Sequence, residues 1–160
     1  VKQPGEVRQF VNTFPPTDDG RMKLWGPFGA LQGPRFVPLE DAKHPLTLIT
    51  PATSFTVNSM FGDTLPPPAV IKLNPTDAGA RGIASGEIVR VFNDRAELTI
   101  EVDVDATIRA GVCSIPKGLW RRSLNGGLTA NAFAPDTYTD LSDGACFNDA
   151  RVQVEKLRTN

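Results

Sequence analysis

The feature that most constrains the fold is a strict alternation of apolar and polar residues near the middle of the chain. The two sets are Leu98, Ile100, Val102 and Val104 against Thr99, Glu101 and Asp103. A period of two is typical of a β-strand with one buried face. Residues 88–92 form another β-branched run, and the intervening Asn93-Asp94 favours a tight turn. The sequence therefore predicts a half-buried β-hairpin over residues 88–104.

Four further runs have the length and composition of short strands: 46–50, 70–73, 112–115 and 151–155. The first three begin or end near proline or glycine, which mark the ends of strands. The 160 residues suit one domain rather than two. Six or more short strands in one domain predict a mainly β fold, either a closed barrel or a sandwich.

One short helix is predicted between two of these strands, over residues 75–81. Asn74 suits the N-cap, Pro75 the first helical position, and Asp77 the positive end of the helix dipole. Gly82 suits the left-handed residue that commonly ends a helix. We therefore expect one or two short helices, the second near residues 6–11.

Residues 1–43 are rich in proline and glycine, which favour extended backbone. We expect an extended N-terminal lead-in arm over 1–43 and the barrel over 44–160. Five aromatic residues suggest that the arm packs on this domain or on a neighbour: Phe10, Phe14, Trp25, Phe28 and Phe36. Because the chain begins with Val rather than Met, we expect it to be part of a longer protein.

Two long irregular segments, 50–63 and 117–148, separate predicted strands. Long loops in a small domain are more often functional than not, so a binding site is expected on these two. Residues 121–142 show no periodicity and are predicted to be one ordered loop.

The residue inventory excludes several kinds of catalytic site. The chain has one histidine, His44, and two cysteines, Cys113 and Cys146. A zinc site needs three or four His, Cys or carboxylate ligands, usually closely spaced. His44 precedes Pro45 and is predicted to be a surface or capping residue, not the base of a Ser-His-Asp triad. The cysteines fit a disulfide and two free thiols equally well.

Charge and motif patterns exclude other functions. Lys and Arg number 17 against 18 Asp and Glu, and a net charge of -1 argues against a general nucleic-acid-binding protein. The sequence contains no run of about 18 apolar residues, so no membrane span is predicted. It also contains no glycine-rich phosphate-binding motif. Asp103 and Asp105 are predicted to be solvated strand charges. We therefore predict no catalytic residue and no protein-held metal in this chain.

A series of motifs in a fixed order nevertheless carries a family resemblance. The motifs are Pro45-Leu-Thr-Leu-Ile-Thr-Pro51, Asn58-Ser59-Met60-Phe61-Gly62, Asn74-Pro75-x-Asp77-Ala78-x-Ala80-Arg81-Gly82-Ile83-x-x-Gly86-Glu87-x-Val89-x-Val91-x-Asn93-Asp94-Arg95, Pro116-x-Gly118-x-Trp120, Leu128-Thr129-x-Asn131 and Phe147-Asn148-Asp149-x-Arg151-Val152-x-Val154. Over residues 44–156 the chain resembles the C-terminal molybdopterin-dinucleotide-binding domain of the molybdenum oxidoreductases typified by dimethyl sulfoxide reductase and formate dehydrogenase. Residues 14–24 are similar to the segment that leads into this domain.

The resemblance implies a double-psi β-barrel, as in aspartate decarboxylase, that binds part of a molybdopterin guanine dinucleotide (MGD). In the parent enzyme this would be bis-MGD with molybdenum. The resemblance also implies that the metal's protein ligand and any iron–sulfur cluster lie outside this chain. The isolated domain is then expected to be inactive, with the parent's remaining domains as its partners. The compartment is left open between cytoplasm, which is favoured, and periplasm.

The resemblance assigns nine cofactor-binding residues to the two long loops: Thr50, Pro51, Ser54, Asn58, Ser59, Met60, Asn131, Phe147 and Asn148. Hydroxyl and amide donors suit a pyrophosphate and the edges of flat heterocycles. In the first loop this chain has Thr53-Ser54-Phe55-Thr56-Val57-Asn58, where many family members carry a basic or histidine residue.

The residues alone leave alternatives open. The hydroxyl and amide residues of the first loop also fit a turn cluster that caps its own backbone. Asn131 also fits an Asx turn before Pro135, and Phe147 fits a core position. Trp120 suits a stacking face or a wall, and Arg121 and Arg122 suit phosphates, a neighbour's acids or plain solvent exposure.

A function of another class also remains open. Double-psi barrels serve elsewhere as protein-interaction or substrate-recruiting modules without a cofactor, so the fold alone does not give the function. Under that hypothesis the aromatic arm would be a docking strip. Self-processing to a pyruvoyl group is set aside, because it needs a Gly-Ser bond and the chain contains none.

Overall fold

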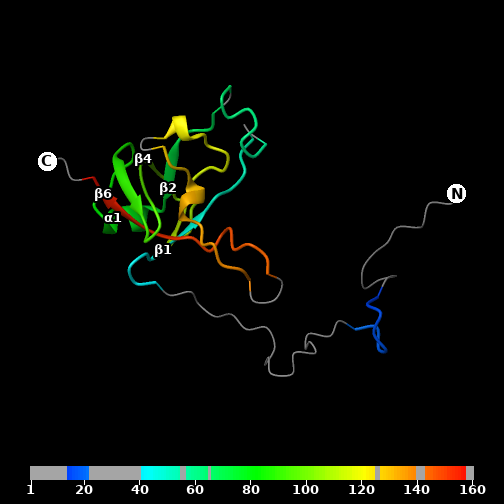
Figure 1. Cartoon of the computed structure of the whole chain (residues 1–160). Coiled ribbons are helices and arrows are strands. Elements are labelled where there is room, and N and C mark those ends of the chain that lie inside the picture. Colours follow the sequence, from blue (N-terminus) through cyan, green and yellow to red (C-terminus); the bar gives the residue numbers. More distant parts are fainter. Residues whose placement is uncertain are drawn as a thin grey trace. The chain divides into compact units, whose positions relative to one another are not determined.

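The alternating runs of the sequence form the walls of a closed six-stranded barrel (Figure 1). The strands are β1 (Leu46–Ile49), β2 (Val70–Leu73), β3 (Ile88–Phe92), β4 (Glu97–Val104), β5 (Val112–Ser114) and β6 (Arg151–Lys156). The computed structural model describes residues 14–21, 41–54, 57–64, 66–124, 127–139 and 143–157. The predicted mainly β fold and all six predicted strands are confirmed, with ends that differ by at most one residue.

The barrel combines parallel and antiparallel neighbours. Its strand order is β1-β5-β2-β4-β3-β6, and β6 closes back onto β1. β1 runs parallel to β5, and β2 runs parallel to β4. The hairpin predicted over residues 88–104 is the β3–β4 pair, in which Val89 lies opposite Ile100.

The core consists of the apolar face of each strand. On β4 the burial follows the predicted alternation, because Leu98, Ile100 and Val102 are buried while Glu101 is exposed. The largest fully buried side chains are Phe133, Leu46, Leu48, Ile71, Leu73, Leu98, Ile115, Val89, Val91, Val102, Val152 and Val154. Two members lie outside the strands: Ile115 directly follows β5, and Phe133 comes from the long segment between β5 and β6, so that segment is anchored in the core.

The predicted helix forms as α1 (Pro75–Ala80), which begins at the predicted residue and ends one residue earlier than predicted. The Asn74 side chain accepts a hydrogen bond from Thr76 N at 2.8 Å. Gly82 has φ +63°, and the next amide, Ile83 N, closes the helix end by donating to Ala78 O. α1 lies beside β6 (Figure 1), where the Arg81 guanidinium donates to Gln153 Oε1 at 3.1 and 3.2 Å.

The segment predicted to be one ordered loop over 121–142 contains short helical turns. These are the 3-10 helices η1 (Arg121–Ser123) and η2 (Ala130–Phe133). A single 3-10 turn is too short to show a hydrophobic period, so the sequence pattern does not predict it. Burial of Phe133, rather than helix propensity, holds η2.

The N-terminal part is described only in a short piece. The chain divides into the units Val1–Leu39 and Glu40–Asn160. Residues 14–21 form a turn in which the Thr17 hydroxyl donates to Arg21 O at 2.8 Å, and Phe14 is exposed. The helix expected near residues 6–11 and the aromatics Phe10, Trp25, Phe28 and Phe36 lie outside the described residues. The arm over 1–43 and the barrel over 44–160 stay predictions.

His44 differs from its prediction as a surface or capping residue. It is buried, with 3% of its surface exposed, and its ring meets Phe92 edge-on at 6.2 Å. His44 Nδ1 lies 2.9 Å from Asp41 Oδ2, and His44 N donates to Asp41 Oδ1. Asp41 is therefore the residue that caps this turn, through its bond from His44 N. Because Asp41 also satisfies the ring nitrogen Nδ1, the His44 ring can pack inward. The bond from the His44 side chain lowers the pKa of Asp41.

The two cysteines are free thiols. Cys113 is buried on β5, and Cys146 is partly exposed. Burial raises the pKa of Cys113 to about 12, so this thiol stays protonated at neutral pH and is not a nucleophile.

The two aspartates predicted to be solvated strand charges have different environments. Asp103 is a half-exposed residue of β4, whereas Asp105 follows the end of that strand. Asp105 Oδ2 accepts from Lys72 Nζ at 2.7 Å, and Asp105 Oδ1 accepts from the Thr107 hydroxyl at 2.6 Å. The bond from Lys72 contributes most to holding the pKa of Asp105 well below its usual range.

Truncation of a core residue on β4 should destabilise the fold far more than truncation of its exposed neighbour. We expect Ile100→Ala to lower the free energy of unfolding by about 2–5 kcal/mol, because it leaves a cavity in the barrel core. Glu101→Ala, the next residue, should change it by about 0.5 kcal/mol or less. Urea unfolding followed by circular dichroism measures both, and equal losses would contradict the alternation described above.

The ion pair of Asp105 should make stability depend on pH in the acid range. A lowered carboxyl pKa contributes stability that is complete above the ordinary value of 3.8 and is lost as the pH falls through the lowered value. Asp105→Asn should therefore be less stable than wild type at pH 7, with a difference that shrinks below pH 3.8. Asp103→Asn is the control, since Asp103 Oδ2 lies 3.7 Å from Lys72 Nζ, farther than the 2.7 Å of Asp105. A difference that stays constant down to pH 2 would refute this role.

Candidate cofactor-binding site

A pocket of about 760 Å³ lies where four irregular segments meet. Its lining residues are Leu48, Thr50, Asn58, Ser59, Pro116, Lys117, Gly118, Leu119, Thr129, Ala130, Asn131, Ala134, Pro135, Ala145, Phe147, Asn148 and Ala150. Apart from Leu48 on β1, these residues come from the segments that follow β1, follow β5, contain η2 and precede β6. The pocket is thus assembled from distant parts of the sequence, as the two-loop prediction required.

The parallel pairing of β1 and β5 extends into two walls of the pocket. Beyond the strands, Ile115 N donates to Ile49 O at 3.1 Å and Lys117 N donates to Pro51 O at 2.9 Å. These backbone bonds hold the segment of Thr50 beside the segment of Lys117. Both wall segments therefore leave the barrel already aligned.

The loop that carries Asn58 and Ser59 is held by Trp120. Trp120 Nε1 donates to Ser59 O at 2.7 Å, and the ring packs over Gly62. A Cβ atom built on Gly62 would lie 2.5 Å from the indole ring. Asn58 has φ +55°, a conformation that Asn adopts more readily than most residues. Trp120 is therefore a wall residue that fixes the loop, and 38% of its surface remains exposed.

Six of the nine predicted binding residues line this one pocket: Thr50, Asn58, Ser59, Asn131, Phe147 and Asn148. Pro51, Ser54 and Met60 do not line it. Pro51 directs its carbonyl to Lys117 N, and the Met60 side chain is 60% exposed. The loop reverses at Asn58, so residues adjacent in the motif face different directions.

The polar side chains of the pocket are free to bind a ligand. Within the described part of the chain, the amides of Asn58, Asn131 and Asn148 make no hydrogen bond, and neither do the hydroxyls of Thr50 and Ser59. This outcome argues against a turn cluster that only caps its own backbone, and against an Asx turn at Asn131. Phe147 is 73% exposed, so it is not a core residue.

Lys117 was missed in the sequence prediction. It lines the pocket and has no ion-pair partner among the described residues. Its position inside the Pro116-x-Gly118-x-Trp120 motif was the available signal. A cation in a pocket with free amides gives that pocket an affinity for anions.

A second, more open pocket of about 550 Å³ adjoins the first. It shares Ser59, Leu119 and Thr129 with the first pocket, and Trp120, Arg121 and Arg122 complete it. The Arg122 guanidinium lies 4.7 Å from the centre of the Trp120 ring and 4.0 Å from Asp63 Oδ2. Two further cations therefore stand beside the pocket of Lys117.

The described residues contain no group of three or more His, Cys, Asp or Glu side chains that would hold a metal ion. In the same residues, no helix has the length and apolar character needed to cross a bilayer. The site's own chemistry is that of amide, hydroxyl and ammonium groups, which bind and orient a polar ligand.

The barrel and its polar pocket are those of a cofactor-binding domain, and comparison with known proteins gives the family. Residues 46–151 match the family described as Molydopterin dinucleotide binding domain. The chain belongs to this family. It is a cofactor-binding domain of the kind found in molybdenum oxidoreductases, which confirms the resemblance seen in the sequence.

Relatives and a solved structure agree with this assignment. The chain is 30% identical to the probable oxidoreductase YoaE of Bacillus subtilis (strain 168), covering 89% of this chain and 22% of the relative. It is 35% identical to dimethyl sulfoxide reductase DmsA of Escherichia coli (strain K12), covering 53% of this chain and 11% of the relative. The chain therefore spans only a small part of these curated relatives.

The fold is also found in a solved structure. Acetylene hydratase from Pelobacter acetylenicus matches with a TM-score of 0.58 and 21% identity, over 71% of this chain and 18% of that one. Together with the closed six-stranded barrel, this match confirms the predicted double-psi β-barrel.

Adding a methyl group at Gly62 should displace Trp120 from Ser59. We expect Gly62→Ala to change the fluorescence emission of Trp120, because the new Cβ would overlap the indole ring and break its bond to Ser59 O. The measurement is made in a Trp25→Phe background so that Trp120 is the remaining indole.

Gly79→Ala provides the control for this prediction. A Cβ on Gly79 meets no atom within 4 Å, and the residue lies inside α1. This variant should leave the fluorescence unchanged and stabilise the protein by about 0.5–1 kcal/mol. An unchanged spectrum in Gly62→Ala would show that Trp120 does not fix the loop.

Proposed function

We propose that this pocket binds part of a molybdopterin guanine dinucleotide. The observation that carries the proposal is that three free side-chain amides and one unpaired ammonium group line a single pocket. A volume of about 760 Å³ lies within the usual range of small-molecule sites, which is about 300–1,000 Å³.

The donor set fits the two chemical parts of such a ligand. The amides of Asn58, Asn131 and Asn148 match the donors and acceptors on the edges of a guanine or a pterin. Lys117 and the Ser59 hydroxyl match the pyrophosphate that joins them. Arg121 and Arg122, in the adjoining pocket, extend the positive potential along the path of a dinucleotide.

In the whole protein we propose that this domain serves an oxidoreductase whose cofactor is bis-MGD with molybdenum. When bound, the cofactor would supply the redox chemistry through its molybdenum. This chain's residues bind and orient the nucleotide part. The metal's protein ligand and any iron–sulfur cluster belong to the parent's remaining domains, which are the domain's partners. The isolated chain is therefore proposed to be catalytically inactive.

The test of this proposal is chemical analysis of the purified full-length parent. It should release guanine nucleotide after acid hydrolysis and contain molybdenum. A parent that folds but carries neither would refute the proposal, and the hypothesis of a cofactor-free interaction module would then be favoured.

Removing the Lys117 charge should weaken the retention of the cofactor. We expect Lys117→Gln in the parent to lower the affinity for the cofactor about tenfold or more, because a hydrogen bond to a charged group contributes about 1.5–3 kcal/mol. Guanine nucleotide retained after dilution and gel filtration measures this loss. Arg109→Gln is the matched control, because Arg109 is exposed and lines neither pocket. Equal retention by both variants would remove Lys117 from the site.

A further inference from the structure

We infer that Asn93, which lies outside the pocket, is a positioning residue for two of its walls. The inference rests on the proposed function of the pocket and concerns how its geometry is kept. Asn93 directly follows β3 and begins the β3–β4 turn. Its side-chain amide joins this turn to two segments that are far away in the sequence.

One end of the Asn93 amide closes the hairpin turn. Asn93 Oδ1 accepts from Arg95 N at 2.9 Å and from Ala96 N at 3.1 Å. The backbone adds a third bond, because Asn93 N donates to Ala96 O at 3.0 Å. The turn is therefore rigid, and it fixes the direction in which Nδ2 points.

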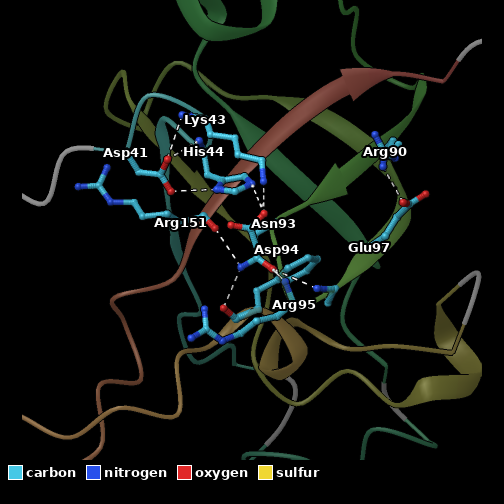
Figure 2. A network of polar contacts seen from close by, with 11 residues as sticks. Asp41, Lys43, His44, Arg90, Asn93, Asp94, Arg95, Glu97 and Arg151 are labelled. Carbon is cyan, nitrogen blue, oxygen red and sulfur yellow. Dashed lines mark hydrogen bonds and ion pairs between the residues drawn. The ribbon is translucent and has the colours of Figure 1, made fainter.

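The other end of the amide donates to two carbonyl groups (Figure 2). Asn93 Nδ2 lies 3.0 Å from Phe133 O and 3.1 Å from Arg151 O. All four hydrogen-bonding positions of the amide are thus used, two as acceptor and two as donor. Such full use of a partly buried amide is costly to disturb, since any replacement leaves buried carbonyl groups unpaired.

Both of these carbonyl groups belong to segments that line the pocket. Phe133 is the last residue of η2, and its neighbours Asn131 and Ala134 line the pocket. Arg151 is the first residue of β6 and follows Ala150, which also lines it. One amide therefore sets the spacing between the η2 wall and the β6 wall.

The η2 wall has few other constraints. It is a single 3-10 turn whose internal bonds are Ala132 N to Thr129 O and Ala134 N to Asn131 O. Burial of Ala130 and of the Phe133 ring holds the turn against the core, but apolar contacts are non-directional and do not fix rotation of the adjacent backbone. The Asn93 bond to Phe133 O supplies that constraint, and with it the direction of the Asn131 side chain.

The chemistry specifies asparagine at this position. Aspartate has the same shape and still accepts from the turn amides, but it presents oxygen rather than N–H to Phe133 O and Arg151 O. Asn93→Asp therefore keeps the turn and removes the two long-range bonds.

Asn74 offers a matched control in the same chain. Its Oδ1 also accepts from a local amide, Thr76 N, and its Nδ2 donates to a distant carbonyl, Ile108 O, at 2.7 Å. Neither Asn74 nor Ile108 lines either pocket. Asn74→Asp thus makes the same chemical change away from the site.

The experiment compares both variants in the full-length parent. We expect Asn93→Asp to retain at least tenfold less guanine nucleotide than wild type after dilution, and Asn74→Asp to retain the wild-type amount. Hydrogen exchange should also show faster exchange at Ala132 N and Ala134 N in Asn93→Asp only, with the β4 amides still protected.

Each alternative outcome is decisive. Wild-type nucleotide content in Asn93→Asp, or equal losses in both variants, would overturn the inference and leave the proposed function intact. A wild-type parent without guanine nucleotide would overturn the proposed function and the inference with it. If Asn93→Asp does not fold, Asn93→Ser replaces it, because the serine hydroxyl still accepts from the turn but is too short to reach both carbonyl groups. Full retention in Asn93→Ser would likewise overturn the inference.

Discussion

The closure of the barrel through two parallel strand pairs is the constraint from which the site follows. Parallel neighbours cannot be joined by tight turns, because the chain must return to the same end of the sheet before it pairs again. β1 with β5 and β2 with β4 are such pairs. In the resulting strand order, β5 lies between β1 and β2, and β1 lies between β5 and β6, so the connections over 50–69 and 115–150 each join strands that are not neighbours. The pocket is made of residues from these two connections together with Leu48 on β1.

A site built from long connections needs tethers that strands do not need. The strands are held by regular backbone ladders and by a shared apolar core. The pocket walls are held by single contacts to neighbouring segments: the Trp120 indole on Ser59, the backbone of Lys117 on Pro51, and the Asn93 amide on Phe133. Each contact involves a polar group whose partner is a backbone carbonyl. The walls are thus fixed while their own side-chain amides and hydroxyls remain free.

The sequence allowed the strands and the helix to be predicted because each has a local cause. The alternation of apolar and polar residues predicted β4, and the end signals of α1 were Asn74, Pro75 and Gly82. The pairing of parallel strands depends on contacts between residues that are far apart in the sequence. The barrel topology was therefore predicted only through the family resemblance. The burial of His44 was missed for the same reason, since the partner that lies edge-on to its ring, Phe92, is on β3.

The site was predicted less evenly than the fold. Asn58, Ser59, Asn131 and Asn148 line one pocket because the motifs that carry them lie at the converging loops. Met60 is adjacent to Ser59, yet it points to solvent, because the direction of a side chain in a loop depends on backbone angles that no periodic pattern reveals. Lys117 was overlooked because the available signal was its position inside the Pro116-x-Gly118-x-Trp120 motif, and a single lysine has no distinctive pattern of its own.

The charge of the whole chain also conceals the charge of the site. A net charge of -1 argues against a general polyanion-binding protein. Within the described part of the chain, most cations outside the pocket are paired with acids, as Lys72 is with Asp105 and Arg90 with Glu97. Lys117 has no such partner among the described residues, and it lines the same pocket as Asn58, Asn131 and Asn148. An unpaired cation at the pocket, with Arg121 and Arg122 lining the adjoining one, favours anions there, so a chain with almost no net charge can still bind a ligand that carries a pyrophosphate.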